Sequence, residues 1–204
     1  MSNKVLIKEI FESIQGEGPY IGVNQLFVRF SKCNLNCDYC DTDFQTNLKE
    51  YTETDFINEI NKYNNIHSVS LTGGEPLLEV DFLKNTLKNI DKKIYLETNG
   101  TLYENLKQII DYIEIISMDI KLPSSTKMPD MFDIHKKFIE TSAEKNKEIF
   151  LKVVFDENIT REEIIKTVNL AKSHNLLIVL QPKTDGEVLN LKSDFISSVF
   201  YKYI

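Results

Sequence analysis

The chain has 204 residues, of which 42% are hydrophobic and 27% are charged, and its formal net charge is -7. This composition excludes the disordered and fibrous classes, and the length predicts one domain that spans residues 1–204. Lysines scattered among acids argue against a direct nucleic-acid partner, because a nucleic-acid groove needs clustered Lys and Arg.

No apolar run has the length of a signal peptide or of a membrane span. We therefore expect a soluble, cytoplasmic protein with no membrane partner, in a compartment where thiols stay reduced. The chain has 3 cysteines, and an odd number cannot pair completely within one chain. A disulfide framework is thus the weakest explanation of these cysteines.

Apolar runs of strand length alternate with amphipathic helical patterns along the chain. The first strand is predicted over 5–13, and the turn IQGEGPYIG (14–22) follows it. Further strands are predicted over 25–30, 68–72, 94–100, 112–121, 148–155 and 176–182. Helices are predicted over 52–63 with Thr52 or Thr54 as N-cap, over 81–90, through Leu106 and Ile109, over 133–145 and 160–175, and from about Ser193.

This alternation indicates an α/β fold with a parallel sheet and crossover helices. About six βα units are too few for a closed eight-unit barrel and suit a partial, open (βα)6-type barrel. Polar residues and glycines collect just after the strands, at 33–42, 72–76, 98–100, 119–121 and 181–184. Because parallel α/β folds place their sites at these carboxyl ends, we expect the functional residues on one rim.

All three cysteines, Cys33, Cys37 and Cys40, lie in the stretch CNLNCDYC. A structural zinc site needs four ligands, and the chain has no fourth cysteine and no histidine near this stretch. Inert core cysteines are the other structural reading, but the loop is polar. An iron–sulfur cluster held by three thiolates, with one iron left open, fits the spacing better.

The C-x-x-x-C-x-x-C spacing after a strand, with Tyr39 before the last cysteine, resembles the radical S-adenosylmethionine (SAM) superfamily. GGEP (73–76), after the next strand, is similar to the second motif of that superfamily. The resemblance implies a 4Fe-4S cluster whose open iron binds SAM and whose reduction yields a deoxyadenosyl radical. It also implies that Gly73 and Gly74 let the backbone approach SAM, and that Glu75 accepts from the SAM ammonium. Taken without the cysteine loop, GGEP would be better explained as an ordinary strand–helix turn.

Three further stretches resemble the 7-carboxy-7-deazaguanine synthase family of the 7-deazapurine (queuosine precursor) pathway. They are ESIQGEGPYIG (12–22), Cys40-Asp41-Thr42, and Arg29 four residues before Cys33. The resemblance covers nearly the whole chain. It implies a carbon–nitrogen lyase that abstracts the C6 hydrogen of 6-carboxy-5,6,7,8-tetrahydropterin, contracts the ring with release of ammonia, and regenerates SAM.

The resemblance also implies roles for single residues. Mg²⁺ would be held by Thr42, with substrate oxygens and water completing the octahedron, although a threonine hydroxyl bonded to backbone is commoner. Arg29 would pair with the substrate carboxylate through its planar fork, the alternative being a surface charge. The other implied contacts to the pterin are Ile14, Gln15, Gly16, Glu17 and Thr72, and those to SAM are Tyr39, Cys40, Asp41, Gly73, Gly74, Glu75, Asp119, Lys121, Gln181 and Lys183.

Two stretches depart from the family. SMDIKLPSS (117–125) resembles the D-x-K of glycyl-radical activating enzymes, and the chain end at Ile204 lacks the Pro- and Gly-containing tail of many relatives. These departures define the alternative function, a glycyl-radical activase. A third hypothesis, without catalysis, is an electron carrier or a metal-stabilised binding module. The family resemblance also implies a reducing partner such as flavodoxin or ferredoxin, and a homodimer.

Overall fold

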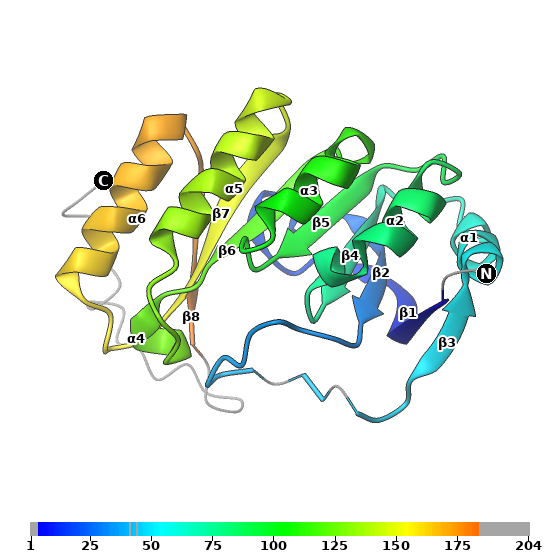
Figure 1. Cartoon of the computed structure of the whole chain (residues 1–204), viewed down its shortest axis with the longest axis horizontal. Coiled ribbons are helices and arrows are strands. Elements are labelled where there is room, and N and C mark those ends of the chain that lie inside the picture. Colours follow the sequence, from blue (N-terminus) through cyan, green and yellow to red (C-terminus); the bar gives the residue numbers. More distant parts are fainter. Residues whose placement is uncertain (1–3, 41, 44, 184–204) are drawn as a thin grey trace.

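The computed structural model describes residues 4–40, 42–43 and 45–183 (Figure 1). They form one eight-stranded sheet in the order β3-β1-β2-β4-β5-β6-β7-β8. The strands are β1 (Lys4–Ile14), β2 (Asn24–Phe30), β3 (Lys49–Thr52), β4 (Ser68–Gly73), β5 (Ile94–Thr98), β6 (Ile115–Ile120), β7 (Glu148–Phe155) and β8 (Ile178–Pro182). The strands from β2 through β4 to β8 are parallel, whereas β1 pairs antiparallel with both β2 and β3.

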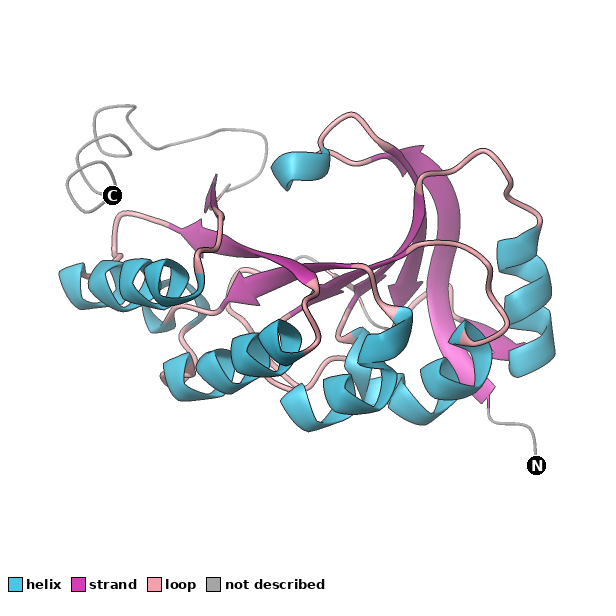
Figure 2. Cartoon of the chain, turned by 90° about the horizontal axis from the view of Figure 1, so that it is seen from above, coloured by secondary structure: helices cyan, strands magenta, loops and turns pink. Residues whose placement is uncertain are grey.

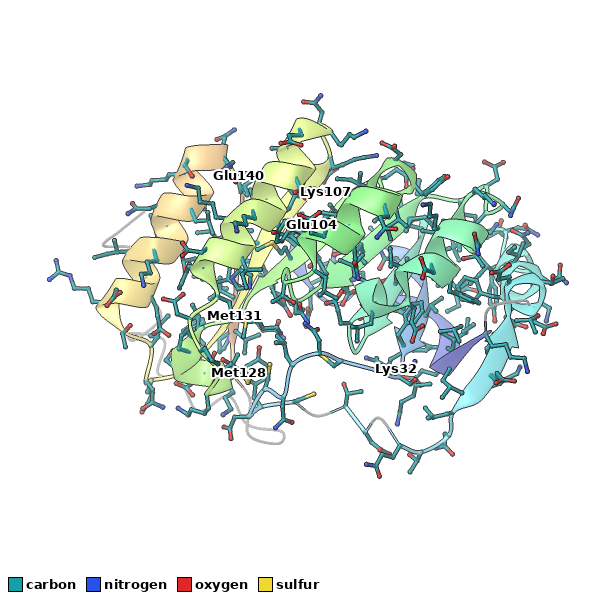
Figure 3. All side chains as sticks on the ribbon, viewed as in Figure 1. Lys32, Glu104, Lys107, Met128, Met131 and Glu140 are labelled. Carbon is teal, nitrogen blue, oxygen red and sulfur yellow. The ribbon has the colours of Figure 1, made fainter. Side chains whose placement is uncertain are left out.

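The main helices lie along one face of a curved sheet, as Figure 2 shows. The α-helices are α1 (Glu53–Asn61), α2 (Val80–Leu87), α3 (Tyr103–Ile109), α4 (Pro123–Thr126), α5 (Phe132–Glu144) and α6 (Arg161–His174), and the short 3-10 turns are η1 (Gly18–Tyr20), η2 (Pro76–Glu79) and η3 (Ile110–Tyr112). The outer helix faces carry charged side chains such as Glu104, Lys107 and Glu140 (Figure 3). Their inner faces bury apolar side chains against the sheet, which supplies most of the stability of such helices.

The predicted (βα)6 arrangement is confirmed, and the element bounds shift by a few residues. Thr52 caps α1 by accepting from Asp55 N, as the sequence suggested. The capping box of α6 between Thr160 and Glu163 explains why that helix was well marked in the sequence. The short edge strand β3 was not predicted, and the helix expected from about Ser193 lies outside the described residues.

The turn between β1 and β2 closes the amino-terminal end of the barrel. Its 3-10 turn η1 places Gly18 at φ +68°, where an added Cβ would lie 3.0 Å from the Phe150 ring. Tyr20 packs edge-on against Tyr95 at 5.6 Å between ring centroids and donates to Glu148 at 2.6 Å. The turn therefore forms the floor of the barrel, while the carboxyl ends of the parallel strands open on the opposite side.

Across the described ranges, no helix combines the length and the apolar character that crossing a bilayer requires.

Candidate active site

A polar cavity of about 540 Å³ lies inside the curve of the sheet. The cysteine loop lines one end of it and the turn after β1 lines the other. Nearly all the site residues expected from the sequence line this one cavity, namely Ile14, Gln15, Gly16, Glu17, Arg29, Cys33, Cys37, Tyr39, Cys40, Thr42, Thr72, Gly73, Gly74, Asp119, Lys121, Gln181 and Lys183. Of the expected residues, Glu75 does not line the cavity and Asp41 lies outside the described residues, as does the chain end at Ile204, for which no role was expected.

The cysteine loop is anchored on both sides of its turn. Cys40 N donates to Cys37 O at 3.1 Å, and Asp38 N donates to the carbonyl of Thr126 in α4 at 3.0 Å. Cys33 and Cys37 are half-buried, and burial raises the pKa of both thiols above the ordinary value. The loop thus holds these thiols partly shielded from water, where they stay protonated. They lose their protons when a metal binds.

The donor set fits a polynuclear cluster better than a single ion. In the described part of the chain, no three His, Cys, Asp or Glu side chains are grouped so as to hold one metal ion. In an iron–sulfur cubane each thiolate binds a different iron, so the sulfurs need not converge on one point. The three free cysteines share one cavity wall, as such a cluster requires.

The glycines of GGEP lie against the backbone that leads into the cysteine loop. A Cβ on Gly74 would lie 1.9 Å from the carbonyl oxygen of Lys32, and Gly73 has φ +108°. Glu75 N donates to the same Lys32 oxygen at 2.7 Å. Because no side chain larger than hydrogen fits at Gly74, this position brings the GGEP segment and the cysteine loop into direct backbone contact.

The Glu75 side chain is fully buried beneath this contact. Its carboxylate accepts from Asn99 N at 2.8 Å, from the Thr98 hydroxyl at 2.9 Å and from Leu77 N at 3.1 Å. Burial raises the pKa of Glu75 to about 7. In contrast to the SAM contact expected from the sequence, the structure turns this carboxylate away from the cavity and into the junction between β4 and β5.

A network of charges crosses the cavity wall on β6 and β7. Lys121 Nζ lies 2.7 Å from Asp119 and 3.1 Å from the Tyr39 hydroxyl. Lys152 Nζ lies 3.0 Å from Glu17 and 3.3 Å from Asp119. Burial alone would raise the pKa of Asp119, but the two ammonium groups outweigh it and hold the pKa below the usual value. Asp119 therefore stays ionised between two lysines.

Gln181, on the same cavity wall, has a carbonyl oxygen that can accept a hydrogen bond from a bound molecule. Its amide nitrogen donates to Glu17 at 2.8 Å, and this contact fixes the amide orientation. Its buried carbonyl oxygen has no hydrogen-bond partner among the described residues. Buried acceptors are rarely left without a donor, so this oxygen marks a place for a donor on a bound molecule.

The other end of the cavity is organised around Glu97 on β5. Its carboxylate accepts from Thr72 at 2.9 Å, from Ser70 at 3.0 Å and from Gln15 at 3.2 Å. Gln15 is buried and also donates to Gln25 at 3.1 Å. These bonds join the turn after β1 to the middle of the sheet.

Sequence reasoning missed Glu97 and Lys152 as site residues. Lys152 is a charge in the middle of an otherwise apolar stretch of strand, the same signal that singled out Arg29. Glu97 lies at the polar end of a strand, two residues before Asn99, and its position among the other strand ends could have marked it. Which of several strand-end residues face the cavity depends on the pleat and register, which the sequence alone leaves open.

Arg29 and Thr42 lie on the cavity wall near the cysteines. Arg29 Nε donates to Glu9 on β1 at 2.6 Å, so the guanidinium is oriented by an ion pair. The Thr42 hydroxyl has no hydrogen-bond partner within the residues that the structure describes. Its role as a ligand stays a prediction from the sequence.

Comparison with known proteins identifies the class of enzyme that this fold and site define. Residues 27–193 match the model of the Radical SAM superfamily, whose members use a 4Fe-4S cluster and SAM. The chain also resembles the structure of anSMEcpe with bound AdoMet, with a TM-score of 0.60 and 20% identity over 85% of this chain and 57% of that one. This likeness supports the fold alone.

Curated relatives show to which family within the Radical SAM superfamily the chain belongs. The chain is 37% identical to the 7-carboxy-7-deazaguanine synthase of Geobacter sulfurreducens, over 91% of this chain and 85% of that protein. It is 34% identical to the 7-carboxy-7-deazaguanine synthase of Archaeoglobus fulgidus, over 85% of this chain and 82% of that protein. The chain therefore belongs to the 7-carboxy-7-deazaguanine synthase family. This membership favours the ring-contracting synthase over the glycyl-radical activase and over a non-catalytic carrier.

Proposed function

We propose that this protein converts 6-carboxy-5,6,7,8-tetrahydropterin to 7-carboxy-7-deazaguanine with release of ammonia. The observation that carries the proposal is the single cavity of about 540 Å³ that joins the three cysteines to the turn after β1. A cofactor bound at the cysteines and a small substrate bound against Gln15 would share this one cavity. Radical chemistry needs this proximity, because the reacting atoms must be held close together and away from water.

Cys33, Cys37 and Cys40 would hold a 4Fe-4S cluster with one iron open for SAM. When bound, the cluster and SAM supply the one-electron chemistry that removes a hydrogen atom from the substrate. Tyr39, Gly73, Gly74, Asp119, Lys121, Gln181 and Lys183 are the SAM contacts that we propose from the cavity lining, and Asp41 joins them from the sequence alone. Lys121 would offer SAM a cationic hydrogen-bond donor, and the carbonyl oxygen of Gln181 would offer it an acceptor.

Arg29 and Thr42 would bind the polar end of the substrate. The ion pair with Glu9 fixes the Arg29 side chain at the cavity wall and leaves terminal nitrogens for a carboxylate. Thr42 would contribute one neutral oxygen to Mg²⁺, and substrate oxygens and water would complete the octahedron.

The turn residues would bind the pterin ring with help from Glu97. A pterin carries N–H donors on its cyclic guanidine edge, and a carboxylate accepts such donors. Glu97 and Glu17 both line the cavity. Ile14, Gln15, Gly16 and Thr72 would complete the pocket.

Several broader properties belong to the proposal. We also propose an electron donor such as a flavodoxin or ferredoxin and a homodimer as the working form, as the sequence resemblance implies. The free cysteines suit the cytoplasm, where thiols stay reduced. One domain over residues 1–204 agrees with the continuous sheet and with a shared core on its helical face.

The activity can be tested directly. Anaerobically reconstituted protein would be given SAM, a reductant, Mg²⁺ and 6-carboxy-5,6,7,8-tetrahydropterin, and the product followed by ultraviolet absorbance and mass. We expect 7-carboxy-7-deazaguanine, ammonia and recovered SAM, and no product from Cys37→Ala, which also loses the brown iron–sulfur absorbance. An intact cluster that cleaves SAM without forming a deazapurine would refute the proposed reaction.

A further inference from the structure

The side chain of Asn99, just after β5, lies against the first cysteine of the loop. Its Nδ2 donates to Asn34 Oδ1 at 2.8 Å and lies 3.9 Å from Cys33 Sγ, at the long end for a sulfur acceptor. The backbone N–H of Leu35 points to the same sulfur at 3.4 Å. Of the three cysteine sulfurs, only that of Cys33 receives N–H donors from the residues that the structure describes.

The orientation of the Asn99 amide is fixed from its oxygen end. Oδ1 accepts from both the backbone N–H and the hydroxyl of Thr101, at 3.1 and 2.6 Å. With the oxygen committed to these two donors, the amino group must face the cysteine loop, which settles the assignment of the two amide ends. One hydrogen serves Asn34, and the other is left for the Cys33 sulfur.

The backbone of Asn99 is equally constrained. Its N–H donates to the buried Glu75 carboxylate at 2.8 Å, and its carbonyl lies 3.1 Å from Nε2 of the buried His135. Asn99 itself is only 5% exposed. A side chain held at this many points cannot swing away when charge on the neighbouring sulfur changes.

We propose that Asn99 raises the reduction potential of the cluster by donating an N–H···S hydrogen bond to the Cys33 thiolate. This inference rests on the proposed ligation of the cluster by Cys33. Reduction adds negative charge to the cluster and its sulfurs, so a donor stabilises the reduced form more than the oxidised one. Hydrogen bonds to charged acceptors are shorter and stronger than neutral ones, so the contact tightens when the thiolate forms.

Asn99 could instead act only as a tether that holds the loop through Asn34, and two variants separate these roles. Asn99→Ala removes both contacts, whereas Asn34→Ala removes the tether and keeps the N–H directed at sulfur. The reduction potential of each reconstituted protein would be measured by a redox titration followed by electron paramagnetic resonance, without SAM or substrate. For Asn99→Ala we expect the ratio of reduced to oxidised cluster at a fixed applied potential to fall about tenfold, or 59 mV for a one-electron couple. For Asn34→Ala we expect the wild-type ratio within about twofold.

An unchanged potential in Asn99→Ala with full iron content would overturn the inference. An equal fall in both variants would overturn it as well, because the loop tether would then be the cause. If Asn99→Ala does not hold its cluster, pulsed magnetic resonance on the reduced wild-type protein labelled with ¹⁵N-asparagine gives the answer. A ¹⁵N coupling that persists when both Asn34 and Asn36 are changed to Ala supports the bond, and its absence from the wild-type protein refutes it. Neither measurement requires turnover, so a failure of the proposed reaction would be recognised separately.

Discussion

Gly74 shows how one residue can decide the position of the cysteine loop. An added Cβ would overlap the Lys32 carbonyl oxygen at 1.9 Å, and that oxygen accepts from Glu75 N. Backbone on both sides of the contact is held by hydrogen bonds, so neither side can move freely. The glycine is therefore required by packing between two protein segments, in addition to any contact with SAM.

Gly74→Ala should therefore separate the GGEP segment from the cysteine loop. We expect it to lower the free energy of unfolding by about 3 kcal/mol, at the upper end for overpacking, and to reduce the iron held after reconstitution. Chemical denaturation and iron analysis would measure both. Gly16→Ala is the matched control, because no atom lies within 4 Å of its added Cβ. Equal stability of the two variants would contradict this account.

His135 makes stability depend on pH through its burial. Burial lowers the pKa of His135 to about 4 from 6.5. The folded-state pKa lies below the unfolded value. The contribution of neutral His135 to the free energy of unfolding is therefore complete above pH 6.5 and is lost as the pH falls through about 4. The shift corresponds to about 3 kcal/mol over that window.

His135→Gln, which keeps an amide donor for the Asn99 carbonyl but cannot ionise, should lack this dependence. We expect its free energy of unfolding to fall less steeply than that of the wild type between pH 6.5 and 4. Urea denaturation at several pH values would measure the two slopes. Parallel slopes would show that His135 does not titrate in this range.

At the scale of elements, the floor of the barrel depends on Tyr20. Its ring joins the small apolar cluster of Tyr95, Ile115 and Phe150, and its hydroxyl donates to Glu148. Burial, followed by the Glu148 contact, raises the pKa of Tyr20 to about 12, so the hydroxyl remains a donor at neutral pH. This side chain therefore helps to hold the turn that carries Gln15 and Glu17, together with the hydrogen bonds of those two residues.

Tyr20→Ala should loosen the turn and weaken substrate binding more than chemistry. If about 1.4 kcal/mol of ordering free energy is lost, the substrate KM rises about tenfold, with a smaller change in kcat. Tyr20→Phe keeps the packing and removes one hydrogen bond, so it should cost about 1 kcal/mol of stability and leave KM near wild type. Steady-state kinetics on both variants would test this, and a KM that does not distinguish them would argue against the ring as the anchor.

The helices and parallel strands were predictable because their hydrophobic periods and caps are local signals. Thr52 and Thr160 cap helices where the sequence suggested helix starts. The edge strand β3 was not predictable in the same way, because its four residues pair with β1 from the far side of the cysteine loop. A strand of four residues is too short to show a hydrophobic period, and its pairing with a segment distant in sequence cannot be predicted from local pattern.

At the scale of the whole molecule, Lys152 couples distant segments across the cavity. It bridges Glu17 of the floor and Asp119 of β6, and its side chain is only 13% exposed. The sequence predicted that residues after the parallel strands share one rim, because parallel strands end together, whereas the turn with Glu17 lies at the opposite end of the barrel. It did not reveal the bridge, since the pairing of Lys152 with Glu17 spans 135 residues.

Lys152→Met should therefore weaken both SAM and substrate binding and lower stability by about 2 kcal/mol. This cost is below that of breaking an isolated buried pair, because Lys121 still neutralises Asp119. Lys166→Met is the matched control, since Lys166 also bridges two acids but on the surface, where ion pairs contribute about 1 kcal/mol or less. Equilibrium dialysis with SAM and chemical denaturation would compare the variants, and equal effects would contradict the bridging role.

The hairpin of β1 and its turn precedes the segment that matches the superfamily, which begins at residue 27. Four of the residues proposed to bind the pterin, Ile14 to Glu17, thus belong to this piece of chain, whereas Arg29, Thr42, Thr72, Glu97 and the residues for cluster and SAM follow it. Exchange of residues 4–24 between members of the superfamily, together with the floor contacts at Phe150 and Glu148, would therefore alter one side of the pterin pocket and leave the three cysteines in place.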